Sequence, residues 1–328
     1  MVSEYEVWSD NLLEAHWFME LDERLSKSDI RTIGKRGSNP LIIDSLVTYD
    51  RPDIILLENG NPILVVEKTR EVPTGHNVGQ RFARLVRAAE LSVPTLFFLP
   101  FDAMKHGKHG SVCSLNARLI RAMLRMTEIH KVPILPVNWP MDGNGELIVD
   151  GSENDHVASL TATLVGQVEP EVAHMVDQEI GWLQTELVRR EMNYPAYSRL
   201  PKSAEILSTS AFFGGINFRD LAGVDVLECR EESLVYTIDM SPEKCRRQDP
   251  YTGMQFLYDY GWLRTGPKPA DRSINLILHV PRVDAATWLA ANPEDYLTKS
   301  CNWYLTADAI VLKDAVIPIT DWPLSDNL

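Results

Sequence analysis

Two apolar runs joined by an Asn-Gly pair constrain the fold of this chain more than any other feature. Residues 53–58 (DIILLE) and 62–69 (PILVVEKT) are almost continuously apolar, as is typical of strands buried on both faces. Between them, Asn59-Gly60 is the strongest short signal for a β-hairpin. The sequence therefore predicts a pair of antiparallel strands in a sheet that is covered on both sides.

The segments around this hairpin predict a mixed sheet flanked by helices. By their hydrophobic spacing, helices are expected at residues 4–27, 78–91, 114–127, 154–165 and 170–192. Further strands are expected at 41–49, 93–100 and 132–139, and a loop at 101–112. A strand meander followed by a crossover helix and a further strand gives an α/β fold, a mixed sheet with helices on both faces.

The length of 328 residues favours two domains. A segment rich in turn residues at 193–205 is the predicted boundary, so we expect a first domain at 1–200 and a second at 201–328. The second part has strand candidates at 233–239, 273–280 and 309–318, and is predicted to be a smaller α+β part.

Composition narrows the class of protein. No apolar run approaches the ~20 residues that span a bilayer, and the acidic N-terminus lacks a signal-peptide pattern. These features predict a cytoplasmic protein with no membrane contact. The four cysteines, Cys113, Cys229, Cys245 and Cys301, form no CxxC pair, which argues against zinc and favours free thiols.

The charge of the chain is unevenly distributed. The formal net charge is −14, which taken alone argues against a nucleic-acid partner. Between Arg51 and Lys131, however, twelve Lys and Arg residues stand against seven Asp and Glu residues, a local excess of about +5. The predicted hairpin lies inside this basic window, which indicates a polyanionic partner there.

Two acidic residues stand at the ends of the predicted hairpin that are far from its turn. Asp53 starts the first strand and Glu67 lies near the end of the second. If the register puts both on one face, two carboxylates converge. Such a pair suits Mg²⁺, which takes few protein ligands and keeps several waters. Bound there, the ion would polarise a phosphate and activate a water.

At these residues the chain resembles the PD-(D/E)XK nuclease superfamily. Pro52-Asp53 is followed, after 13 residues, by Glu67-Lys68, and the predicted element order over residues 4–137 is similar to the core of that superfamily. The resemblance implies a restriction-endonuclease-like fold and a metal-dependent phosphodiesterase. It also implies a supporting metal ligand on the N-terminal helix, here Glu14, and a helix glutamine near the site, here Gln80.

One position departs from the family pattern. The pattern is acid, any residue, lysine, whereas Lys68 directly follows Glu67 and Thr69 stands two residues on. A bulge could re-aim Lys68, Thr69 could take the lysine position, or Lys68 could act with a second acid supplied by Glu71 or the helix. We expect Asp53 and Glu67 to be the metal ligands and Lys68 to be the third catalytic residue.

The candidate DNA contacts are basic or amide side chains near the predicted site and in the second domain. They are Gln80, Arg81, Arg84, Lys105, Lys108, Arg246, Arg247 and Gln248. A glycine-bearing loop at 71–79 precedes the helix and suits a phosphate. The plainer alternative for the arginines is a solvated helix face.

Together these features predict a Mg²⁺-dependent endodeoxyribonuclease that resembles type II restriction enzymes and cuts double-stranded DNA. The symmetry of duplex DNA makes a homodimer the expected assembly. One alternative is a non-catalytic DNA-binding or defence-complex protein on a degraded nuclease core, which the displaced lysine supports. Another is an unrelated acidic interaction protein whose basic window is accidental.

Overall fold

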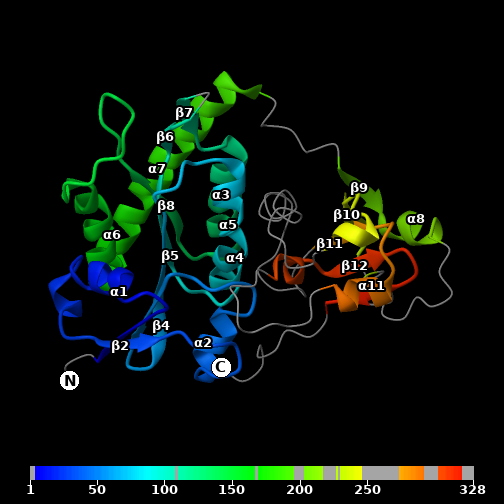
Figure 1. The fold of residues 1–328 in the computed structure, drawn as a ribbon, viewed down its shortest axis with the longest axis horizontal. Coiled ribbons are helices and arrows are strands. Elements are labelled where there is room, and N and C mark those ends of the chain that lie inside the picture. The colour runs from blue at the N-terminus through cyan, green and yellow to red at the C-terminus, as the bar shows by residue number, and fades with distance from the viewer. Residues whose placement is uncertain are drawn as a thin grey trace.

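The computed structural model describes residues 4–107, 110–166, 169–195, 203–216, 227, 230–245, 273–291 and 302–319. Two larger sheets form its framework, and a short hairpin makes a third (Figure 1). The six-stranded sheet lies within residues 5–139 and the five-stranded sheet within 204–318. Each therefore draws its strands from one side of the predicted boundary near residue 200.

The six-stranded sheet is mixed, as predicted. Its order is β2-β1-β3-β4-β5-β8. Antiparallel pairing joins β1 to β3 and β3 to β4, whereas β4, β5 and β8 run parallel, as do β1 and β2. The strands are β1 (Tyr5–Ser9), β2 (Asp29–Thr32), β3 (Ile54–Glu58), β4 (Asn61–Lys68), β5 (Thr95–Pro100) and β8 (Ile134–Trp139).

The hairpin that the Asn-Gly pair predicts is confirmed. Asn59 and Gly60 have φ values of 51° and 81°, the left-handed conformation that a type I′ turn needs at both central residues. The pairing runs from Glu58 opposite Asn61 to Ile54 opposite Val66, with an irregularity between Leu56 and Leu57. The turn thus fixes which residues of the two strands face each other.

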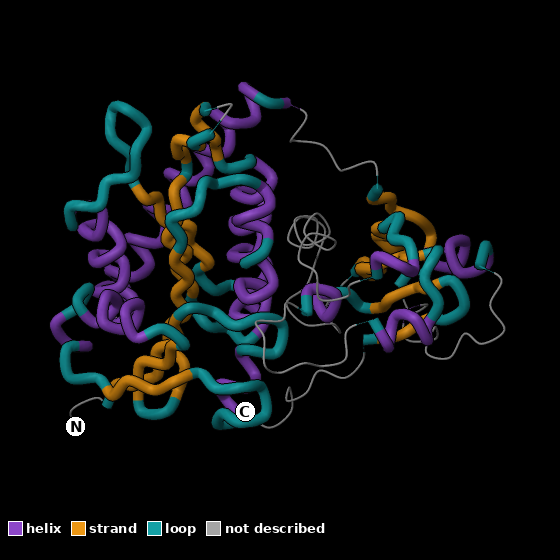
Figure 2. The backbone as a smooth tube through the Cα atoms, viewed as in Figure 1, coloured by secondary structure: helices purple, strands orange, loops and turns teal. Residues whose placement is uncertain are grey.

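Helices cover both faces of this sheet (Figure 2). One face packs on α1 (Leu12–Met19) and α6 (Asp155–Gly166), and the other on α2 (Leu41–Leu46), α4 (Phe82–Glu90) and α5 (Ala117–His130). The long helix α7 (Glu169–Asn193) contacts α6, β8 and α5, and so borders the sheet beside β8. The remaining short helices of this part are α3 (Gly75–Gly79), η1 (Glu23–Leu25) and η2 (Ser152–Asn154).

Several predicted elements were wrong in type. Residues 4–27 contain the strand β1 before the shorter helix α1, because Val7 and Trp8 pair with β3 and are buried. Residues 41–49, predicted as a strand, begin with the helix α2 (Leu41–Leu46), which follows Pro40. A short apolar run does not separate the two types by periodicity. The loop predicted at 101–112 contains the hairpin of β6 (Asp102–Lys105) and β7 (Ser111–Ser114).

The five-stranded sheet has the order β13-β12-β11-β10-β9. Its central strands β10, β11 and β12 are parallel, which differs from the antiparallel sheet of a typical α+β part. The three predicted strand regions are present, and β9 was not predicted. The elements are β9 (Ala204–Ser208), α8 (Thr209–Gly214), β10 (Glu232–Thr237), η4 (Pro242–Lys244), β11 (Ile274–Val280), α11 (Ala285–Ala290), β12 (Ala309–Leu312) and β13 (Val316–Pro318).

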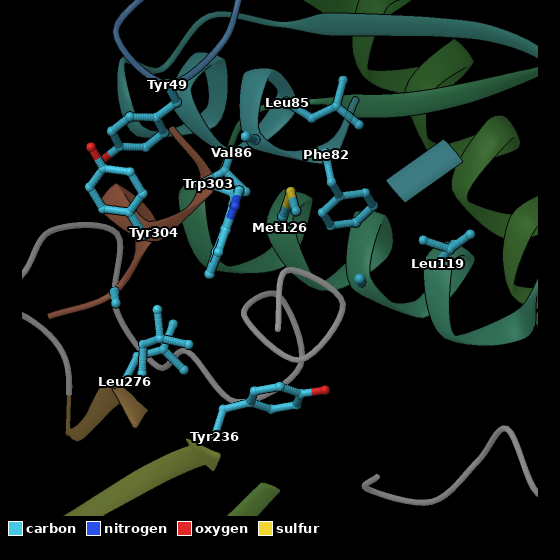
Figure 3. Close-up of a cluster of buried hydrophobic side chains, with 14 of the residues drawn as sticks. Tyr49, Phe82, Leu85, Val86, Leu119, Met126, Tyr236, Leu276, Trp303 and Tyr304 are labelled. Carbon is cyan, nitrogen blue, oxygen red and sulfur yellow. The ribbon is translucent and has the colours of Figure 1, made fainter. Parts of the chain in front are cut away.

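A short helical turn joins the second part to the first. Just before η6 (Trp303–Thr306), the backbone N–H of Asn302 donates to the Tyr49 carbonyl at 2.5 Å, and its side-chain amide donates to the Thr48 carbonyl at 3.2 Å. Trp303 is fully buried and shares one apolar cluster with Val86 of α4 (Figure 3). The two parts therefore have a common core at this contact.

Within the ranges that the structure describes, every helix is too short or too polar to traverse a lipid bilayer.

Candidate functional site

The hairpin brings Asp53 and Glu67 together. Because Ile54 pairs with Val66, Asp53 lies opposite Glu67 at the end of the ladder far from the turn. The backbone N–H of Asp53 donates to Oε2 of Glu67 at 3.3 Å. Asp53 is 6% exposed and Glu67 is 0% exposed. Two buried carboxyl groups therefore meet at the end of β3 and β4 that is far from the turn.

Arg84 of α4 lies between these carboxylates. Its Nη1 donates to both oxygens of Glu67, at 2.9 and 2.8 Å, and is 3.7 Å from Oδ1 of Asp53. Its Nε and Nη2 donate to Oδ2 of Asp50, at 2.8 and 2.5 Å. One guanidinium thus lies within ion-pair distance of three buried carboxylates. Arg84 was predicted to contact DNA, but it is only 8% exposed, because its guanidinium pairs with carboxylates inside the protein.

Arg81 adds a second guanidinium to Glu67. Its Nε lies 2.9 Å from Oε1 of Glu67, and its Nη1 donates to Glu71 at 3.1 Å and to the Asn77 carbonyl at 2.5 Å. The side chain of Arg81 is 16% exposed, so it lies between the buried cluster and the surface. Gln80, in the turn between α3 and α4, is partly exposed.

Burial and the neighbouring opposite charges shift the pKa values of Glu67 and Arg84 in opposite directions. Complete burial raises the pKa of Glu67 above its usual value, and the nearby Asp53 adds to this effect, whereas Arg84 and Arg81 lower it. Burial also disfavours charge on Arg84, yet Asp50 and Glu67 together raise the pKa of its guanidinium well above the usual value. Buried ionisable groups with such opposed influences are common at functional sites.

Lys68 points to the opposite face of the sheet from Glu67. Its Nζ lies 3.6 Å from the centre of the Trp17 ring on α1 and 5.6 Å from that of Trp139 on β8. Its backbone N–H donates to Oδ2 of Asp53 at 2.9 Å. Burial, with some help from Arg70, lowers the pKa of Lys68 to about 8.

Of the three explanations offered for the displaced lysine, the one in which a bulge re-aims Lys68 is wrong. From Val65 to Lys68, β4 pairs with β5 in regular register, so the side chains of this stretch alternate normally. The irregularity of the hairpin lies nearer its turn, between Leu56 and Leu57 of β3. Thr69 is two residues beyond Glu67 and is buried, but carries no charge. Glu14 on α1 acts electrostatically on Lys68, together with Glu153. The helix acid therefore belongs to the Lys68 side of the sheet.

The other predicted contacts are not brought to this cluster by any described interaction. Lys105 ends β6 and is exposed. Lys108, Arg246, Arg247 and Gln248 lie outside the described residues. Asp50 was missed from the sequence, although its place three residues before Asp53, with Pro52 between them, was a usable signal.

The donor chemistry of the cluster suits a hard divalent cation. Two carboxylates are enough protein ligands for Mg²⁺, and the positive Nη1 of Arg84 already lies between Asp53 and Glu67. Among the described residues, no group of three or more His, Cys, Asp or Glu side chains is arranged to hold a metal. Asp53 and Glu67 are therefore the pair whose chemistry fits the ion, in competition with Arg84.

Comparisons with protein-family models, with curated proteins and with solved structures found no match to this chain.

Proposed function

We propose that this protein is a Mg²⁺-dependent endodeoxyribonuclease with a restriction-endonuclease-like core, and that Asp53 and Glu67 are its acidic centre. The observation that carries the proposal is the meeting of these two buried carboxylates around one cation, Nη1 of Arg84. They lie at one end of the central strands β3 and β4, in a mixed sheet in which an antiparallel meander precedes parallel strands. The basic window that surrounds the hairpin supports a polyanionic substrate.

Each residue of the cluster has a role in this proposal. Asp53 and Glu67 would hold Mg²⁺, which when bound supplies an activated water and a positive charge at the phosphate. Asp53 is oriented by the backbone N–H of Lys68. Arg84 holds Glu67 and Asp50 in place. Arg81, partly exposed beside Glu67, is the cation best situated to meet a substrate phosphate.

The proposed substrate is double-stranded DNA, and the proposed assembly is a homodimer. Both follow from the resemblance and from the two-fold symmetry of a duplex. Lys68 does not face Glu67, so in this proposal the charge of the transition state is balanced by Arg81 rather than by a strand lysine.

A cleavage assay tests the proposal. Unmodified plasmid and phage DNA are incubated with the protein in Mg²⁺ or in EDTA. We expect discrete fragments in Mg²⁺ alone, and a loss of roughly 100-fold or more in Asp53→Asn and Glu67→Gln. Glu58→Gln, at the turn end of the same hairpin, is the matched control and should keep full activity. Cleavage that survives both site variants would overturn the assignment.

A second candidate is a DNA-binding protein on a nuclease-like core that no longer cuts. It is favoured by the contacts of Glu67, whose two oxygens both accept from Arg84. The orientation of Lys68 toward Trp17 also favours it. Salt-sensitive binding to duplex DNA, with no cleavage in Mg²⁺, would establish this candidate in place of the first.

A further inference from the structure

A hollow of about 530 Å³ lies at the end of β8, the last strand in the order of the six-stranded sheet. The end of β8, the turn η2, the start of α6 and the middle of α7 enclose it. Its volume is in the range of small-ligand sites. The side chains that matter for its chemistry are Asn138, Glu153, His156, Gln178, Glu179 and Trp182.

An aromatic surface forms part of its wall. The indole of Trp182 is 44% exposed, which is unusual for so large an apolar side chain. Phe101 packs against it with ring centres 5.2 Å apart and the planes tilted by 39°. The indole is therefore supported by a ring of the core and still offers surface to a planar ligand.

The polar part of the wall is rich in hydrogen-bond acceptors. Glu153 and Glu179 are 6% and 8% exposed, so their carboxylates are fixed in the wall rather than free in solvent. Glu179 is paired with His156. Asn138 accepts from the backbone N–H of Phe101 through Oδ1, and its amino group is a hydrogen-bond donor. These carboxylates would repel a phosphate and accept from an amino group.

The hollow is linked to the residues of the proposed function through Lys68. Glu153 lines it and also acts electrostatically on Lys68, whose backbone N–H binds Asp53. Asn138 precedes Trp139, whose ring lies 5.6 Å from Nζ of Lys68. The parallel strands β4, β5 and β8 have their carboxyl ends at the same end of the sheet, where open α/β sheets commonly bind ligands.

We propose that this hollow binds one unpaired nucleobase that carries an exocyclic amino group: cytosine, adenine or guanine. The base stacks on Trp182, and its amino group donates to Glu153 or Glu179, while Asn138 donates to a ring nitrogen or carbonyl. The choice of a nucleobase among amino-bearing planar ligands rests on the proposed function. The hollow would then hold a base of the strand whose backbone reaches Asp53.

Binding of free deoxynucleosides tests this without any need for cleavage. The full chain in EDTA is dialysed to equilibrium against deoxycytidine, deoxyadenosine, deoxyguanosine or thymidine. We expect saturable binding of at least one of the three nucleosides that carry an exocyclic amino group, deoxycytidine, deoxyadenosine and deoxyguanosine. Thymidine, which has no such group, should bind more weakly or not at all. The dissociation constant should rise at least about fivefold in Trp182→Leu, because stacking is lost.

Two further variants keep the test sharp. Glu179→Gln should weaken binding while leaving Trp182 in place. Tyr194→Leu, at an exposed aromatic just after the end of α7, should leave binding unchanged. No saturable binding of any nucleoside, or equal affinity in Trp182→Leu, would overturn the proposal. Because the assay contains no Mg²⁺ and no DNA, its failure is separate from a failure to cleave.

Discussion

Arg84 and Glu67 form a buried ion pair in which a single guanidinium nitrogen, Nη1, donates to both carboxylate oxygens at 2.9 and 2.8 Å. The same guanidinium binds Asp50, so it holds α4 to the residues on both sides of Pro52. This pairing explains how a helix side chain that the sequence suggests is a surface cation comes to lie in the interior. It also makes Arg84 the residue on which the charge balance of the site depends.

Arg84→Met should strongly destabilise the fold. The change leaves three buried carboxylates with one remaining guanidinium, and breaking a buried pair on one side costs about 3–5 kcal/mol. Urea unfolding in EDTA, followed by circular dichroism, measures the loss. Arg81→Met is the matched comparison and should cost less, because Arg81 is 16% exposed. A loss below about 1 kcal/mol for Arg84→Met would contradict the buried ion pair.

Mg²⁺ should stabilise Arg84→Met more than it stabilises the wild-type protein. Without the guanidinium, the space between Asp53 and Glu67 has no cation, and an ion that binds only the folded state raises the unfolding free energy. Thermal unfolding over a series of Mg²⁺ concentrations measures this. The double variant Arg84→Met/Glu67→Gln is the control and should lose the effect. Equal shifts in all three proteins would show that the pair does not attract the ion.

Lys68 should make stability depend on pH in alkaline solution. Its pKa falls from 10.5 to about 8 on folding, so between these values the unfolded chain holds a proton that the folded protein has released. The unfolding free energy of the wild type should therefore rise with pH across this window, relative to Lys68→Met, by at most ~1.4 kcal/mol per pH unit. Paired urea titrations from pH 7.5 to 10.5 measure the difference, and parallel curves would contradict the burial of Lys68.

Trp303→Ala should cost about 3–5 kcal/mol, the usual loss for a buried aromatic. Trp303 is 0% exposed and packs in the cluster that contains residues of both parts. If this cluster couples them, one cooperative unfolding transition should become two in the variant, as seen by calorimetry. Leu289→Ala, at a 59% exposed position of α11, should leave the transition unchanged.

Local signals predicted the centre of the fold well. The Asn59-Gly60 turn and the apolar strands β3, β4, β5 and β8 all follow from short-range patterns, and the structure contains them. Where the prediction was wrong, tertiary contacts decided the outcome. Val7 and Trp8 lie within residues 4–27, whose hydrophobic spacing predicts a helix, but their pairing with β3 makes them part of a strand.

Sequence patterns predicted the acidic residues of the site, but not the cations that neutralise them. Strand position and distance from the turn were enough to bring Asp53 opposite Glu67. Which helix residue would neutralise them depends on how α4 crosses the sheet, and that is set by packing of Phe82 and Val86 rather than by local pattern. The cluster residue Asp50 was missed because its partner, Arg84, is 34 residues away.

The contact between Asn302 and residues Thr48 and Tyr49 has a consequence for synthesis on the ribosome. Asn302 and Thr48 are 254 positions apart in sequence, so the first sheet can be complete long before its covering residue is made. At ~5–20 residues per second, the apolar surface of α4 that Trp303 covers would wait roughly ten seconds or more for it. A nascent chain of this protein therefore passes through a stage in which a chaperone has a defined surface to protect.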